Sequence, residues 1–214
     1  RMDMRPIRMA LTKGRLENKT IALLEQSGMN CTCLKEKGRR LIIRIGEYQF
    51  VFAKANDVVT YVEYGVCDVG VVGKDTLMEM QRPVYELLDL NFGRCKFALA
   101  TLREKDFYAG YGVKTVATKY PNVAKQFFEQ KNMDVEIVRI EGSVELAPIL
   151  NLADGIIDIV ETGTTLRENG LEVKEDVADI SARLIVNVAS LKLKKDEIEG
   201  FAALLKNGAG REQV

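Results

Sequence analysis

Short apolar runs rich in branched residues alternate along this chain with segments of helical periodicity. The first run, Ile7 to Leu11, predicts a buried strand, and apolar residues then recur at helical spacing until Gly28. Such alternation is typical of an α/β protein. Further strands are predicted at 41–45, 48–53, 68–72, 84–90, 95–102, 115–118, 135–140, 156–160 and 183–193, and further helices at 56–64, 121–131, 142–150 and 196–206.

The pattern also predicts two lobes. A change of composition near Gly93 and a polar segment at 103–112, read as a crossover or mobile loop, precede a restart of the alternation. Residues 64–68 and 152–155 share a layout in which a helix end and an acidic residue lead into an apolar strand and a glycine turn. This layout favours two similar α/β lobes with a cleft between them, although α/β sequences also produce it by chance. The predicted first lobe contains residues 1–93 plus about 180–193, and the second contains 94–179 plus about 194–207.

Composition and charge narrow the function. The chain has 214 residues, 47% of them hydrophobic, which suffices for one large domain or two small ones. Lys and Arg total 31, as do Asp and Glu, so no global positive field attracts nucleic acid and any anion site must be built locally. There is no apolar run of roughly 20 residues and no secretory layout, so we expect a cytoplasmic protein without membrane contact.

The chain contains no histidine, which excludes histidine-dependent triads, zincin motifs and imidazole proton shuttles. Its four cysteines are Cys31, Cys33, Cys67 and Cys95, and the CxC pair has no second pair at a zinc-site spacing. Reduced structural thiols are therefore favoured over a metal or redox site. We assign no metal ligands.

The sequence TGTT at 162–165 follows a predicted buried strand and precedes a helical turn. Backbone N–H groups in such a loop point around an anion, and Gly163 allows close approach. Just upstream, Asp154, Asp158 and Glu161 can accept hydrogen bonds from sugar hydroxyls. Together these features indicate a ribose-phosphate site, whereas a threonine-rich helix cap with solvated acids is the alternative.

Three basic segments are candidates for phosphate binding. KGR at 13–15 follows the first strand, where α/β proteins usually bind ligands, although a turn with solvated charges is favoured when these residues are taken alone. Arg39 and Arg40 could be surface charges of a hairpin. GKD at 73–75 lacks the glycines of a P-loop, so a Walker-type NTPase is not supported.

Six motifs in order make the chain resemble the ATP phosphoribosyltransferase family from about Ile7 to Leu193. They are TKGRL, DVVTYVEYGVCDVGVVGKD, YELLDLNFGRCKFALAT, VATKYPNVAKQFF, EGSVELAPILNLADGIIDIVETGTTLRENGL and SARLIVN. The resemblance implies transfer of the 5-phosphoribosyl group from phosphoribosyl pyrophosphate to N1 of ATP, with release of pyrophosphate, as the first step of histidine biosynthesis. It also implies two α/β lobes similar to the type II periplasmic binding proteins, with the active site in the cleft.

The resemblance further implies residue roles. Arg15 and Arg39 match basic positions that face ATP phosphates or departing pyrophosphate and are the expected catalytic residues. Magnesium is expected to arrive with the substrate phosphates. The expected ATP-binding residues are Lys13, Gly14, Arg15, Gly73 and Lys74, and those for phosphoribosyl pyrophosphate are Glu141, Gly142, Ser143, Glu145, Asp154, Asp158, Thr162, Gly163, Thr164, Thr165 and Leu166.

The same family suggests partners. Long-form members carry a C-terminal histidine-binding domain, whereas this chain ends soon after the 196–206 helix and resembles the short form. We therefore expect a homodimer and a separate regulatory subunit that resembles a histidyl-tRNA synthetase; a truncated long form is the alternative. The rival functions are a solute-binding module of the same fold and a catalytically silent regulatory subunit. The intact KGR and DIVETGTTL motifs count against the silent subunit.

Overall fold

The protein divides into two α/β units. The structure, a computed structural model, describes residues 5–210. One unit is drawn from residues 1–93 and 181–214, and the other is Arg94–Ile180. Residues 1–4, which the sequence prediction places in the first lobe, lie outside the described residues. Within the described range, no helix is both long and apolar enough to cross a membrane.

The first unit is built on a six-stranded sheet. Its strands are β1 (Ile7–Thr12), β2 (Ile42–Ile45), β3 (Tyr48–Ala53), β4 (Val69–Gly73), β5 (Tyr85–Asp89) and β11 (Ala182–Val186), and its helices are α1 (Arg15–Gln26), α2 (Thr32–Lys35), α3 (Ala55–Glu63), α4 (Lys74–Met80), α8 (Val188–Leu193) and α9 (Lys195–Gly210). The strand order is β2-β3-β1-β4-β11-β5, and β1 is parallel to both β3 and β4. The carboxyl ends of these three strands therefore lie at one edge, beside the starts of the antiparallel strands β2 and β11.

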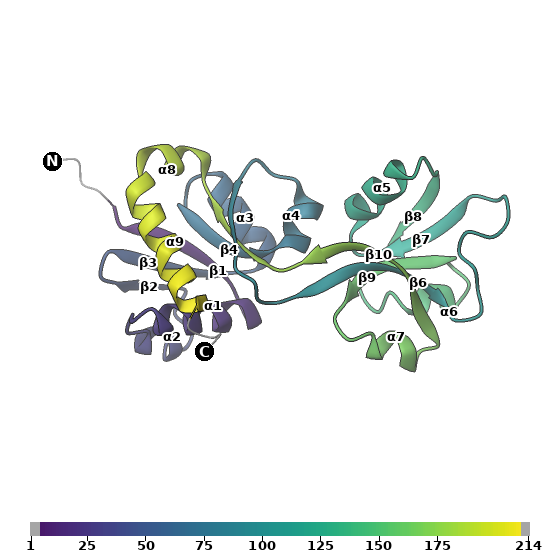
Figure 1. The fold of residues 1–214 in the computed structure, drawn as a ribbon, viewed down its shortest axis with the longest axis horizontal. Helices are drawn as coiled ribbons and strands as arrows, with labels where there is room; N and C mark the ends of the chain where they lie inside the picture. Colours follow the sequence, from purple (N-terminus) through teal and green to yellow (C-terminus); the bar gives the residue numbers. More distant parts are fainter. Residues whose placement is uncertain (1–4, 211–214) are drawn as a thin grey trace. The chain divides into compact units, whose positions relative to one another are not determined.

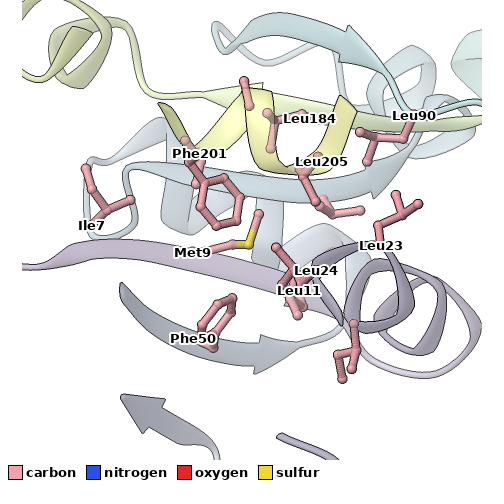
Figure 2. Close-up of a cluster of buried hydrophobic side chains, with 14 of the residues drawn as sticks. Ile7, Met9, Leu11, Leu23, Leu24, Phe50, Leu90, Leu184, Phe201 and Leu205 are labelled. Atoms are coloured by element: carbon pink, nitrogen blue, oxygen red, sulfur yellow. The ribbon is translucent and has the colours of Figure 1, made fainter. Parts of the chain in front are cut away.

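Alternation along β1 supplies the two faces of this sheet. Met9 and Leu11 belong to a core covered by α1 and α9, whereas Ala10 belongs to a core on the other face, formed with α3. Figure 2 shows Met9 and Leu11 among side chains of the first core, with Phe50 from β3 and Leu184 from β11.

The position of α9 differs from the prediction that 194–207 belongs to the second lobe. Ile198, Phe201 and Leu205 are fully buried in the first unit's core, at the i, i+3 and i+7 positions of one helical face. Figure 2 shows Phe201 and Leu205 in this core. A Cβ atom on Gly208 would collide with the backbone of Leu23, so glycine allows α9 to approach α1 closely. The apolar stripe of α9 is therefore buried against the first sheet, and Figure 1 shows the helix beside that sheet.

The prediction of one strand at 183–193 is also wrong beyond Val186, where α8 follows β11. Asn187 caps this helix: its side chain accepts a hydrogen bond from Ser190 N (2.9 Å) and donates one to Val62 O (2.8 Å). An apolar run of this length is compatible with a strand or a helix, and the buried cap decides between them.

The second unit is built on a five-stranded sheet. Its strands are β6 (Cys95–Leu102), β7 (Lys114–Thr118), β8 (Val135–Arg139), β9 (Gly155–Val160) and β10 (Leu171–Ile180), and its helices are α5 (Pro121–Gln130), α6 (Leu146–Ile149) and α7 (Thr164–Glu168). The order is β10-β6-β9-β7-β8, and β7 is parallel to both β8 and β9. Helices α5 and α7 lie on opposite sides of this sheet (Figure 1). Strand β10 is absent from the sequence prediction because its charged residues interrupt the apolar pattern that predicts a strand. It pairs with β6 through two register shifts.

The polar segment 103–112, predicted as a crossover or mobile loop, is anchored within the second unit. Phe107 is 2% exposed, and its ring lies against the position where a Cβ atom on Gly155 would be. The Tyr108 hydroxyl donates a 2.5 Å hydrogen bond to Glu175. Burial, assisted by this bond, raises the pKa of Tyr108 to about 12. Two aromatic side chains therefore hold the segment in place.

None of the four cysteines, all of which lie within residues 5–210, forms a disulfide. Cys31 and Cys67 are buried, and desolvation raises the pKa of each thiol to about 11. Both groups therefore remain protonated and unreactive near neutral pH.

Candidate functional site

Parallel pairing brings the EGSVE and TGTT motifs to one edge of the second unit's sheet. EGSVE (141–145) follows β8, TGTT (162–165) follows β9, and β7 lies between these two strands. Because all three strands are parallel, their carboxyl ends share an edge. Open α/β sheets bind ligands at this edge.

Hydroxyl groups and one arginine organise the TGTT loop. The hydroxyls of Thr162 and Thr164 are 3.0 Å apart and hydrogen-bonded, and Gly163 between them has φ 76°, which glycine tolerates best. The Arg167 guanidinium donates to Thr162 O (2.9 Å) and to Thr164 Oγ1 (3.4 Å). The loop thus presents hydroxyls and a cation together.

Leu166 and Thr165 have different environments at the start of α7. Leu166 is 5% exposed and packs in the second unit's core, so its side chain anchors the turn and only its backbone can meet a ligand. Thr165 is exposed. Amide N–H groups in a first helical turn lack intrahelical acceptors, so those of Thr165 and Leu166 remain available to an anion, whereas Thr164 N donates to Thr162 Oγ1 (3.4 Å).

Asp158 lies near the end of β9 in a half-buried position. Desolvation raises the pKa of its carboxyl, whereas the positive charge of Lys119 acts in the opposite direction and the charge of Glu145 adds to the increase. These effects place Lys119, Glu145 and Asp158 within electrostatic range of one another. Asp158 therefore lies within electrostatic range of the residue that follows β7 and of the EGSVE loop.

The EGSVE loop is mostly exposed. Glu141 pairs with Arg139 at 3.0 Å, Gly142 and Ser143 are exposed, and Glu145 is half-buried. The helix predicted at 142–150 forms only over Leu146–Ile149, and Asn151, in a left-handed conformation with φ 60°, follows its end. The longer non-helical loop leaves more backbone accessible to a ligand.

Asp154 is a correction to the predicted ribose site. It precedes β9 whereas TGTT follows it, and six residues of strand separate the two by roughly 20 Å. Its carboxylate accepts a hydrogen bond from Thr115 N (2.8 Å), and its carbonyl accepts one from Thr101 Oγ1 (2.6 Å). Asp154 therefore joins strands at the amino edge of the sheet and cannot share a ligand with TGTT.

KGR occupies the carboxyl end of β1 in the first unit. Gly14 has φ 101° and ψ −130°, a conformation essentially restricted to glycine. Gly14 N donates to the carboxylate of the buried Glu17 (3.2 Å), which fixes the turn. Lys13 and Arg15 are exposed on either side of this glycine.

Arg39 lies at the same edge, just before β2. Lys37, two residues earlier, forms an ion pair with Glu17 and lies 4.7 Å from the centre of the Phe52 ring. Arg40 folds back onto carbonyl oxygens of its own turn, whereas Arg39 is exposed and forms no side-chain hydrogen bond or ion pair with residues 5–210. Glu17 therefore links the two predicted basic segments.

Gly73 ends β4 at this edge too and Lys74 begins α4, but the lysine charge is already paired. Its ammonium is 2.7 Å from Glu86, which also pairs with Arg183 at 2.9 Å. A nucleotide phosphate would have to compete with Glu86 for Lys74. The lysine is thus a weaker candidate for ATP binding than the sequence suggests.

The sequence prediction misses two cations at the second unit's candidate site, Lys119 and Arg167. Lys119 directly follows β7, so its position after a parallel strand was a usable signal; that β7 lies between β8 and β9 was not visible. Arg167 is brought back to Thr162 by the turn of α7. Across the described residues, no group of three or more Cys, Asp or Glu side chains is arranged to hold a metal ion.

Comparison with known sequences identifies a single family. The profile of the ATP phosphoribosyltransferase family matches residues 54–207. An ATP phosphoribosyltransferase of Clostridium kluyveri is 57% identical over 197 residues, covering 91% of this chain and 90% of the relative. That of Clostridium acetobutylicum is 55% identical over 208 residues, covering 96% and 97%.

Solved structures agree with these sequences. A chain of the ATP phosphoribosyl transferase (HisG:HisZ) complex from Thermotoga maritima is similar, with a TM-score of 0.82, 30% identity and coverage of 96% of this chain and 99% of that one. The periplasmic aliphatic sulphonate binding protein SsuA from Escherichia coli matches with a TM-score of 0.60 at 11% identity, covering 99% and 76%. The second likeness concerns the fold alone, which is that of the type II periplasmic binding proteins.

Proposed function

The chain belongs to the ATP phosphoribosyltransferase family, whose reaction is the first step of histidine biosynthesis, and we propose that its second unit binds the phosphoribosyl pyrophosphate substrate. The observation that carries this proposal is the shared carboxyl edge of β7, β8 and β9, where EGSVE and TGTT meet. Fold similarity to a solute-binding protein makes binding without catalysis the competing function.

The loop after β9 is assigned to the 5-phosphate of the sugar. Thr162, Thr164 and Thr165 offer hydroxyls, Gly163 permits close approach, and backbone amides of 163–166 complete the cradle. The ribose hydroxyls are assigned to Asp158 and to the EGSVE loop, where Glu141, Gly142, Ser143 and Glu145 lie. Asp154 is left out because it lies at the other edge of the sheet.

The first unit is assigned to the nucleotide and to leaving-group charge. Lys13, Gly14 and Arg15 supply cations and backbone at the end of β1, and Arg39 lies at the same edge. Adenine N1 is already nucleophilic at neutral pH, so the chain needs no strong base, in keeping with its lack of histidine. Magnesium carried by the substrate phosphates would neutralise part of the leaving-group charge, and arginine would add to this effect.

The location that fits these substrates is the cytoplasm, and the assembly we propose is a homodimer.

A direct assay tests the enzyme proposal. The chain is mixed with ATP, phosphoribosyl pyrophosphate, magnesium and pyrophosphatase, and absorbance growth from the adenine adduct is followed. We expect turnover that requires both substrates. Calorimetric binding of substrate without turnover, in the presence and absence of a regulatory subunit, would favour the solute-binding module instead.

Replacing Thr165 with valine tests the sugar-phosphate loop. The substitution keeps the shape of the side chain but removes an exposed hydroxyl, at the cost of one hydrogen bond to a charged group. We expect the apparent KM for phosphoribosyl pyrophosphate to rise by up to about tenfold. Steady-state kinetics with each substrate varied in turn measure this effect. A change confined to the KM for ATP would contradict the assignment.

We also propose a separate regulatory subunit of the HisZ type, because the similar Thermotoga maritima structure is a HisG:HisZ complex. We expect the isolated chain to be insensitive to histidine, and addition of the subunit to raise its activity and to confer inhibition by histidine. Initial rates with and without the subunit, over a range of histidine concentrations, measure both effects. Histidine sensitivity of the isolated chain, or an unchanged rate on mixing, would refute the proposal.

A further inference from the structure

Lys119 lies at the centre of the candidate site in the second unit. It directly follows β7, the strand that pairs in parallel with β8 on one side and with β9 on the other. EGSVE and TGTT follow those two neighbours. The lysine therefore leaves the sheet between the two loops assigned to phosphoribosyl pyrophosphate.

The backbone that presents Lys119 is firmly held. The hydroxyl of the fully buried Thr118 donates to Ile157 O (2.7 Å) and accepts from Tyr120 N (2.9 Å), so it bridges β7, β9 and the turn. The Tyr120 ring packs edge-to-face on Phe97 at a centroid distance of 4.8 Å. Residues on both sides of Lys119 are thus fixed, and only its own side chain is free to adjust.

The charges around Lys119 leave it available to a ligand. Arg139 is paired with Glu141, and Arg167 donates to Thr162 and Thr164. Lys119 is exposed and, within the part of the chain that the structure describes, forms no side-chain hydrogen bond or ion pair. Burial raises the pKa of the Asp158 carboxyl, and the charge of Lys119 partly offsets that increase, as expected for an ammonium near the end of β9.

We propose that Lys119 binds a phosphoryl group of phosphoribosyl pyrophosphate. The inference rests on the proposed function of this edge and extends it to a residue outside both motifs. The site already contains several carboxylates, so a substrate with many negative charges requires an unpaired cation there. A lysine ammonium is a compact charge with three donors and suits a phosphoryl oxygen.

Calorimetry on the full chain tests this role with the variant Lys119→Gln. Compared with the wild type, we expect the affinity for magnesium phosphoribosyl pyrophosphate to fall by about 10- to 100-fold, because a hydrogen bond to a charged group is lost. The affinity for ATP should stay unchanged. Lys119→Arg should retain most of the affinity, since the charge remains. The matched control is Lys125→Gln, on the exposed side of α5, where the lysine pairs with Glu129 at 4.0 Å.

Two smaller probes identify the end of the substrate that Lys119 contacts. Weaker binding of ribose 5-phosphate by Lys119→Gln would assign the lysine to the 5-phosphate, and weaker binding of inorganic pyrophosphate would assign it to the diphosphate; either result supports the proposal. If the wild type binds phosphoribosyl pyrophosphate and Lys119→Gln binds it equally well, this inference alone is overturned. If the wild type neither binds that substrate nor turns over, the proposed function fails, and this inference with it.

Discussion

Replacing Arg15 with alanine is expected to lower kcat/KM by about 100-fold or more, the size of effect found when one donor to developing charge is removed. Arg15 is exposed at the first position of α1, beside a glycine turn that Glu17 holds in place. The substitution therefore removes charge without disturbing the core. Steady-state kinetics with both substrates varied measure the loss.

The kinetic constants also identify the partner of Arg15. A fall in kcat at constant KM for ATP indicates that the guanidinium stabilises departing pyrophosphate, whereas a higher KM at constant kcat indicates contact with the triphosphate. Lys19→Ala, an exposed position on the same helix, is the control and should behave like the wild type. An Arg15→Ala enzyme with a kcat/KM within twofold of the wild type would remove Arg15 from the site.

Replacing Phe201 with alanine is expected to reduce the free energy of unfolding of the first unit by about 3 to 5 kcal/mol, because a large aromatic side chain leaves a cavity in a packed core. Phe201 is fully buried among the core side chains of Figure 2, and its ring packs edge-to-face on that of Tyr48, with the ring centroids 5.2 Å apart. Lys206→Ala, on the exposed face of α9, should change this free energy by no more than about 0.5 kcal/mol.

Hydrogen exchange is the suitable measurement, because two units need not unfold in one step. In Phe201→Ala, amides of β1 and β4 should exchange faster, whereas those of β7 and β9 should keep their protection. The second unit serves as the internal control, because α9 packs in the core of the first. Loss of protection confined to the second unit would show that α9 belongs there after all.

Much of the candidate site was accessible from the order of residues alone. The threonines and glycine of TGTT and the lysine, glycine and arginine of KGR each follow an apolar strand, and a strand that ends in a polar glycine turn is visible in one dimension. Asp154 shows the limit of this reasoning. It is only four residues from Asp158, yet it lies at the other edge of the sheet, because a strand separates its two ends by its full length.

What the sequence determined by itself is the α/β class, most strands and helices, and the family, because these depend on local periodicity and on the order of motifs. Only the tertiary structure decided that β7 lies between β8 and β9, which places Lys119 at the site, and that α9 covers the first sheet. It also turned the run after Val186 into a helix, because the side chain of the capping Asn187 is held in place by Val62 O. In each case the deciding interaction joins residues far apart in the chain. Strand order and helix docking depend on which apolar faces remain exposed after the other elements have packed, and the local sequence does not specify this.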